Sequence, residues 1–154
     1  MIKFIDGDLV KSAEEYEVIL HGCNCQNTMG KGIALQIKEK FPEAYEVDCK
    51  TKKGDIAKLG TISYTTNTTP IIVNCYTQFN YRKKYEDEAL VFVDYNAIKT
   101  ALQAVKKHFT GKKIGMPLIG CGLGGGDDKI VLKIIETILG DEDVTIVKYS
   151  NKGF

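Results

Sequence analysis

The chain has 154 residues, 44% of them hydrophobic and 27% charged, which fits one compact domain and excludes two independent catalytic domains. Its 21 basic and 20 acidic residues leave a formal net charge of +1 with neutral histidines. That balance excludes the overall basic field that draws proteins to nucleic acid or acidic membranes, so any phosphate must be held locally.

Short apolar runs alternate with helical periods along the chain. The runs are rich in β-branched residues and predict strands at residues 2–6, 17–20, 61–65, 71–76, 113–119 and 144–149. Apolar residues recur at helical spacing at 33–41, 97–105 and 131–138, where Pro42 ends the first helix and Gly140 the third. This alternation predicts an α/β domain whose central sheet is covered on both faces.

The N-terminus and the cysteines indicate the compartment. Charged residues interrupt the first apolar run too early for a signal peptide, and no run approaches the roughly 20 residues of a membrane span. Five cysteines at irregular spacing argue against a secreted disulfide framework, and Cys23-x-Cys25 lacks the spacing of a zinc site. We therefore expect a cytoplasmic protein with buried free thiols, no structural metal and no membrane partner.

Three segments lack periodicity, at residues 22–32, 77–88 and 120–128. Each follows a predicted strand, and ligands of open α/β sheets bind beyond the carboxyl ends of the strands. Gly30-Lys31-Gly32 opens a helix, and the run 120–126 holds glycine at five of seven positions before another. Exposed backbone amides and helix N-termini can hold a diphosphate, although glycines also serve tight turns. Neither loop fits the phosphate-loop or dinucleotide fingerprint, which disfavours ATP hydrolysis and NAD-dependent chemistry.

Polar residues beside these loops have both a chemical and a structural interpretation. Asn24 and Asn27 can contact ribose hydroxyls or stabilise a turn. His21 can act as acid or base near neutral pH or stay a structural histidine. Asp127 can cap the N-terminus of a helix, act as a general base, or do both. Asp8 can accept a hydrogen bond from the exocyclic amine of a nucleobase or shape its turn.

Residues 80–85 (NYRKKY) mix aromatic and cationic side chains, a pairing used on single-stranded nucleic acid. Acidic residues follow at 86–88. The local charge therefore favours a solvated lid or loop over a nucleic-acid patch.

Four motifs occur in one order: Gly7-Asp8-Leu9, His21-Gly22-Cys23-Asn24, Gly30-Lys31-Gly32-Ile33-Ala34 and the run 117–127 (PLIGCGLGGGD). With them the chain resembles a macrodomain over nearly its whole length, most of all the branch of ADP-ribose-1''-phosphate phosphatases and related ADP-ribosyl hydrolases. The resemblance implies a single domain over residues 1–154, a three-layer α/β/α fold and a mixed central sheet of about six strands. It also implies ADP-ribose as ligand, with no metal or organic cofactor.

The resemblance gives each candidate residue a role. Asp8, with the Leu9 backbone beside it, would recognise the adenine amine, and Asn24 would fix the distal ribose. His21 and Asp127 would form the acid–base pair. The implied contacts to ribose and diphosphate come from the two loops, together with Asn27: Gly30, Lys31, Gly32, Ile33, Gly120, Cys121, Gly122, Leu123, Gly124, Gly125 and Gly126.

Three positions depart from the family pattern. Lys31 replaces a glycine found in many macrodomains and places a cation near the distal ribose, which favours a terminal phosphate. Leu123 stands where many relatives have an aromatic residue. Thr77 aligns with the lysine that some hydrolases use, so a covalent lysine mechanism is not expected unless Lys83 or Lys84 reaches the site.

Three functions fit these residues. The first is removal of phosphate from ADP-ribose-1''-phosphate. The second is hydrolysis of ADP-ribose from a modified protein or nucleic acid, and the third is a non-catalytic reader of ADP-ribose. A monomer is the default for a small, nearly neutral domain.

Overall fold

The computed structural model describes residues 2–83, 86 and 90–149. Its strands form one six-stranded sheet in the order β1-β6-β5-β2-β4-β3. Neighbouring strands are parallel except β3 and β4, which are antiparallel, so the sheet is mixed as expected. The strands are β1 (Ile2–Gly7), β2 (Val18–Asn24), β3 (Ile62–Tyr64), β4 (Ile71–Gln78), β5 (Ile114–Met116) and β6 (Val144–Tyr149).

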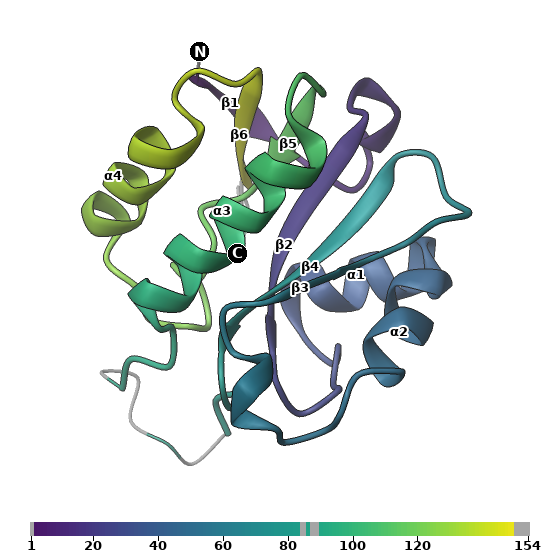
Figure 1. The fold of residues 1–154 in the computed structure, drawn as a ribbon, viewed down its shortest axis with the longest axis vertical. Helices are drawn as coiled ribbons and strands as arrows, with labels where there is room; N and C mark the ends of the chain where they lie inside the picture. The colour runs from purple at the N-terminus through teal and green to yellow at the C-terminus, as the bar shows by residue number, and fades with distance from the viewer. Residues whose placement is uncertain (1, 84–85, 87–89, 150–154) are drawn as a thin grey trace.

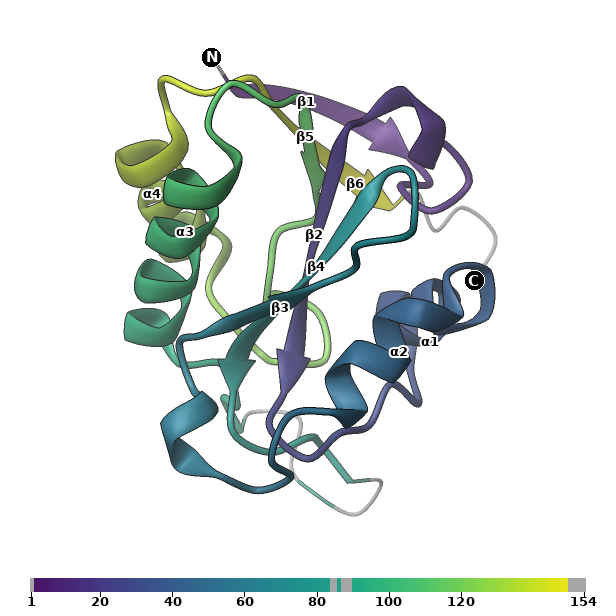
Figure 2. The ribbon, with the colours of Figure 1, turned by 45° about the vertical axis from the view of Figure 1, so that its right-hand side comes forward.

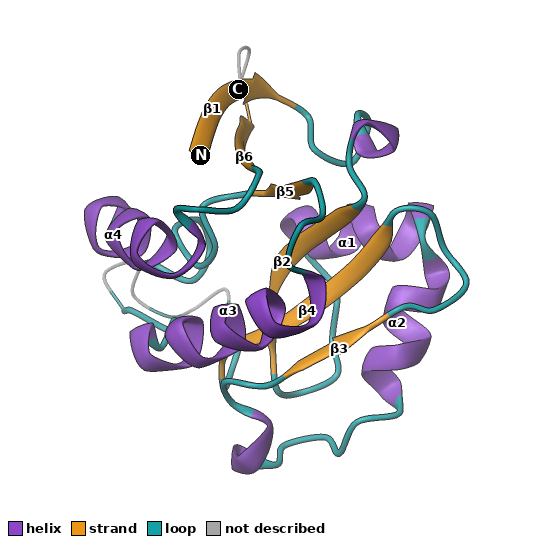
Figure 3. Ribbon diagram, turned by 45° about the horizontal axis from the view of Figure 1, so that its top comes forward, coloured by secondary structure: helices purple, strands orange, loops and turns teal. Residues whose placement is uncertain are grey.

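Helices cover both faces of this sheet, which confirms the three-layer α/β/α prediction (Figures 1 and 3). On one face lie α3 (Tyr95–Phe109) and α4 (Asp128–Leu139), and on the other lie α1 (Gly32–Lys40) and α2 (Pro42–Cys49). The helix α2 was not predicted from the sequence. Pro42 does end α1, but it also occupies the first turn of α2, where the missing N–H of proline has no cost.

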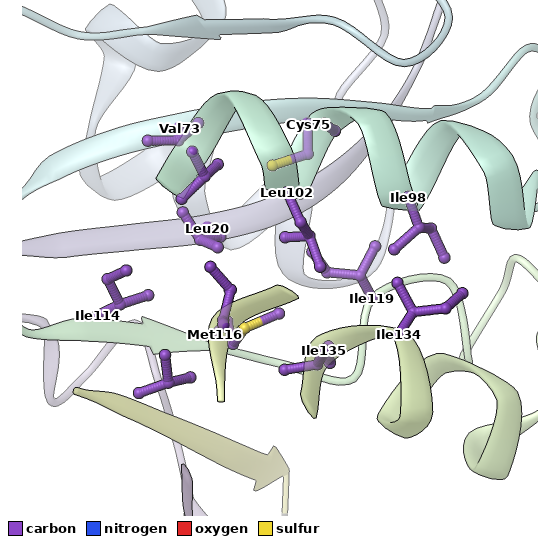
Figure 4. Close-up of a cluster of buried hydrophobic side chains, with 14 of the residues drawn as sticks. Leu20, Val73, Cys75, Ile98, Leu102, Ile114, Met116, Ile119, Ile134 and Ile135 are labelled. Atoms are coloured by element: carbon purple, nitrogen blue, oxygen red, sulfur yellow. The ribbon is translucent and has the colours of Figure 1, made fainter. Parts of the chain in front are cut away.

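Alternation along the strands explains how one sheet holds two cores. Val18 and Leu20 of β2 belong to the core under α3 and α4. Figure 4 shows Leu20 there with Val73 and Cys75 of β4. Ile19, between them, points to the opposite face and packs with Ile37 of α1. Because successive side chains of a strand point to opposite faces, His21 lies on the same face as Ile19, toward α1 and α2.

Several strand bounds differ from the predicted ones, and three of the differences affect the loops. The strand β2 continues to Asn24, β4 continues to Gln78, and β5 stops at Met116. Residues 117–127 are therefore a long loop between β5 and α4. All strands except β3 run parallel, so the loops after β2, β4 and β5 meet at one edge of the sheet, where Figure 2 shows the arrowheads of β2 and β4.

Candidate functional site

A cavity of about 570 Å³ opens at this edge, a volume typical of small-molecule sites. It lies between the loop that follows β2, the start of α1 and the loop that follows β5. Backbone and small residues form much of its wall. The lining residues are Gly22, Cys23, Asn24, Thr28, Gly30, Lys31, Gly32, Ile33, Ala34, Gln78, Tyr81, Arg82, Pro117, Leu118, Ile119, Gly120, Gly122, Leu123 and Gly124.

The first turn of α1 contributes one wall of the cavity. Lys31 occupies the N-cap position with an extended backbone, and its side chain makes no capping hydrogen bond. The turn holds no acidic residue that would compensate the partial positive charge of the helix N-terminus. Gly32 has φ +58°, and a Cβ there would lie 3.7 Å from Leu123 Cδ1, which places α1 against the glycine loop. This wall suits an anion.

The glycine loop at residues 120–126 contributes the opposite wall. It is folded on itself: the amide of Gly126 donates to the carbonyl of Gly120 (2.7 Å), and that of Gly125 donates to Gly122 (3.1 Å). Gly124 fits so closely that a Cβ would lie 2.7 Å from Gly120 O. Within the part of the chain that the structure describes, no acceptor pairs with the amides of residues 122–124. These residues and those of the first turn of α1 line one cavity.

Arg82 ties the glycine loop to the segment before α3. Its Nε donates to Leu123 O (3.1 Å), and its Nη2 donates to Leu90 O (2.5 Å). The guanidinium also lies 4.9 Å from the centroid of the Phe92 ring. Sequence reasoning did not select Arg82 as a site residue, although the aperiodic cationic segment 80–85 pointed to its position.

Asn24 lines the cavity at the end of β2, as expected for a residue that meets a ribose. Its Oδ1 accepts from the Gln26 amide (2.8 Å), and its Nδ2 donates to Thr28 Oγ1 (2.8 Å). Both partners lie in the same loop, so the amide group is held in one orientation at the cavity wall.

Asn27 does not line the cavity. It has φ +56°, in the left-handed region that asparagine tolerates, and its Nδ2 donates to Thr51 O (3.0 Å). Its Oδ1 accepts from Lys58 Nζ. The turn-stabilising interpretation of Asn27 therefore matches its contacts.

His21 is fully buried and does not line the cavity. Asn74 Nδ2 donates to Ala44 O and Ser63 Oγ, so Asn74 Oδ1 is the acceptor that faces His21 Nε2 at 2.6 Å. Burial lowers the pKa of His21 to about 4, against a smaller upward effect of the Asn74 bond. Burial therefore favours the neutral form of the imidazole.

Asp127 is the N-cap of α4, the safer of its two expected roles. Its Oδ1 accepts from the amides of Lys129 (2.8 Å) and Ile130 (3.3 Å). The Asp127 amide donates to Tyr95 Oη (3.0 Å), which joins α4 to α3. The carboxylate is solvent-exposed and, like His21, is not among the residues that line the cavity.

The remaining predicted residues divide between the wall and its supports. Asp8 accepts from the Lys11 amide (3.1 Å) in the turn after β1, and Leu9 is buried in the core. Gly125 and Gly126 do not line the cavity, but their amides donate to the carbonyls of the lining residues Gly122 and Gly120. Cys121 does not line it either and is half-buried, and burial raises the pKa of its thiol to about 12.

The end of β4 places two neighbours differently. Thr77 is buried, whereas Gln78 lines the cavity. Lys83 is exposed and does not line the cavity, and Lys84 lies outside the described residues.

The described residues hold no group of three or more metal-ligating side chains, and all five cysteines are unpaired. Nor does that part of the chain contain a helix with the length and apolar character to cross a membrane.

Comparison with known proteins gives a family and several relatives. The family model described as the macro domain matches residues 20–135. The uncharacterized 17.5 kDa protein of the tk-vs intergenic region of Enterobacteria phage T4 is 34% identical over 154 residues, which cover 97% of each chain. The DNA ADP-ribosyl glycohydrolase of Mycobacterium tuberculosis is 30% identical over 158 residues. That match covers 99% of this chain but only 43% of the mycobacterial protein.

Two further similarities complete the comparison. The ADP-ribose 1''-phosphate phosphatase of Saccharomyces cerevisiae is 23% identical over 171 residues, which cover 94% of this chain and 97% of the yeast protein. Among solved structures, the macrodomain of Mycobacterium tuberculosis DarG superposes with a TM-score of 0.74 at 23% identity and 99% coverage of both chains. This likeness confirms the fold.

Proposed function

The chain belongs to the macro domain family, and from this premise we propose that it binds ADP-ribose in the cavity and removes phosphate from ADP-ribose-1''-phosphate. One observation carries the binding proposal: the first turn of α1 and residues 122–124 line the same cavity, and the amides of residues 122–124 have no backbone acceptor among the described residues. Two opposed sets of amides suit the two phosphates of a diphosphate. The names of the yeast and mycobacterial relatives support ADP-ribose as the ligand.

The proposed ligand spans the carboxyl edge of the sheet. Asn24 contacts the distal ribose, because it lines the cavity beside the start of α1. The adenine extends toward the turn after β1, where Asp8 follows a strand that ends at the same edge. The Asp8 carboxylate keeps acceptor capacity beyond its Lys11 bond and can receive the adenine amine.

Lys31 is the residue that favours a phosphorylated ligand. It sits at the N-cap of α1, lines the cavity and makes no capping bond, so its ammonium group can meet a phosphate at the distal ribose. In the proposed reaction, water attacks phosphorus and the bond to the 1'' oxygen breaks. That oxygen takes the proton of the water, and inorganic phosphate leaves.

The positions of His21 and Asp127 change their proposed roles. Neither lines the cavity, so we assign them to the framework, as a buried hydrogen-bonded histidine and as a helix cap. Lys31 and the loop amides then stabilise the negative charge, and Asn24 orients the ribose, as preorganised donors do in phosphoryl transfer.

A second candidate is hydrolysis of ADP-ribose from nucleic acid. Tyr81 and Arg82 line the cavity at the end of β4 and would face a group attached to the distal ribose. The mycobacterial relative is named for this activity and is similar along 99% of this chain. We also propose a cytoplasmic location, which the unpaired cysteines support, and a monomeric state.

The test is a phosphate-release assay with calorimetry. We expect release from ADP-ribose-1''-phosphate, and we expect Lys31→Met to weaken binding of that substrate by about tenfold while ADP-ribose loses less, because one charged contact is removed. Lys99→Met, on the exposed side of α3, is the matched control and stays unchanged. Tight ADP-ribose binding with no phosphate release, and no release of ADP-ribose from DNA, would identify a reader instead.

A further inference from the structure

A buried polar cluster lies behind the cavity wall, on the face of the sheet that α1 and α2 cover. Lys58, at the end of the 3-10 turn Ile56–Lys58, is only 6% exposed. Its Nζ donates to Asn27 Oδ1 (2.5 Å), lies 4.0 Å from Asp48 Oδ1 and lies 4.7 Å from the centroid of the Tyr76 ring. Asp48 is 1% exposed and accepts from Tyr76 Oη (2.8 Å).

Stability alone does not account for this cluster. Removing a charged amine and a carboxylate from water costs several kcal/mol each, and their attraction offsets that cost only when the geometry is good and other polar atoms are satisfied. Here the ion pair is long, and within the described chain Asp48 Oδ2 has no hydrogen-bond partner. Burial raises the pKa of Asp48, against the opposing effects of Tyr76 and Lys58, in agreement with an imperfectly compensated carboxylate.

The shortest contact of the buried lysine is with the loop that lines the cavity. Asn27 holds a backbone conformation that most residues avoid, and Lys58 and Thr51 bind the two ends of its side-chain amide. On either side of Asn27 the chain reaches the cavity, at Asn24 and Thr28, which are joined by their own hydrogen bond of 2.8 Å. A shift of Asn27 therefore moves both cavity residues.

We infer that Lys58 is a positioning residue for the ligand site: through Asn27 it fixes the loop that presents Asn24 and Thr28 to the distal ribose. The inference rests on the proposed function, because it assigns a purpose to that same cavity. The Asn27 contact carries the effect to the cavity, whereas Asp48, 4.0 Å from the amine, balances its buried charge.

Two variants separate positioning from stability. Asp48→Asn keeps an oxygen acceptor for Tyr76 and leaves Lys58 able to donate to Asn27. Asp48→Asn combined with Lys58→Met removes the buried charges together, which is often neutral or stabilising, but it also removes the bond to Asn27. We expect the first variant to bind ADP-ribose within about twofold of wild type and the second about tenfold more weakly, at equal or greater stability to urea.

A third variant tests the same inference independently, in case the double variant does not fold. Asn27→Gly adopts the positive φ without strain and lacks both side-chain anchors, so it should lose affinity as the double variant does. Equal affinities of the double variant and Asp48→Asn, with Asn27→Gly also unchanged, would overturn the inference.

Hydrogen exchange separates this inference from the proposed function. Amides 24–28 should exchange faster in the double variant than in Asp48→Asn with no ligand present, and equal exchange contradicts the positioning role. Absence of ADP-ribose binding by the wild type refutes the proposed function whatever the exchange result.

Discussion

Replacing Asp127 separates its capping role from the catalytic role that the sequence also allowed. Asp127→Ala removes the acceptor of two α4 amides, at 2.8 and 3.3 Å, and should cost about 1–2 kcal/mol. In a domain of this size that loss lowers Tm by roughly 2–8 °C. Asp127→Asn keeps an oxygen acceptor and loses only the interaction of a charge with the helix N-terminus, about 0.3–1 kcal/mol for an exposed group.

The assay pairs thermal unfolding with phosphate release from ADP-ribose-1''-phosphate. Since the carboxylate does not line the cavity, Asp127→Asn should keep kcat within about twofold, whereas loss of a general base costs about 100-fold or more. A stable Asp127→Asn protein with turnover reduced by that larger factor would refute the assignment of Asp127 to the framework.

Three further predictions concern a buried histidine, a bridging arginine and two glycines. Burial lowers the pKa of His21 from its ordinary value of about 6.5 to about 4, so the unfolded chain binds a proton at a higher pH than the folded protein. The free energy of unfolding is therefore highest above pH 6.5 and falls by about 3 kcal/mol as the pH is lowered toward 4. Urea unfolding of His21→Gln should show a flatter pH dependence. Calorimetry should find that Arg82→Lys and Arg82→Met both bind ADP-ribose several-fold more weakly than wild type, while the affinity of the control Lys83→Met is unchanged. Wild-type affinity in Arg82→Lys would show that only the charge at this position matters. Gly124→Ala should cost about 1–3 kcal/mol, whereas Gly122→Ala, whose Cβ meets nothing within 4 Å, should unfold like wild type.

The sequence predicted the sheet well because periodicity reports burial. All six strand segments are present, and the apolar stripe from Ala97 to Val105 is the buried face of α3. The helix α2 was missed because its apolar periodicity is weak and Pro42 was interpreted only as a stop. A proline can end one helix and begin the next, and sequence spacing alone does not distinguish the two.

The candidate site was predictable where backbone forms it and less so where side chains do. Glycine runs near Gly30 and Gly122 marked both walls of the cavity, since few other roles need so many exposed amides. The hydrogen bond of the buried His21 is made with Asn74, 53 residues away along the chain, and no local sequence pattern reveals such a contact. Lys58 was missed for the same reason, because it is a surface residue by type and reaches Asn27 only in the folded chain.

The central claim is that two opposed sets of backbone amides hold the diphosphate of ADP-ribose. Titration of the ¹⁵N-labelled protein with ADP-ribose, followed by amide chemical shifts, tests it directly. The account predicts the largest shifts at residues 31–34 and 122–124, on the two walls of the cavity. Saturable binding with its largest shifts at other amides, and none at these two segments, would contradict it.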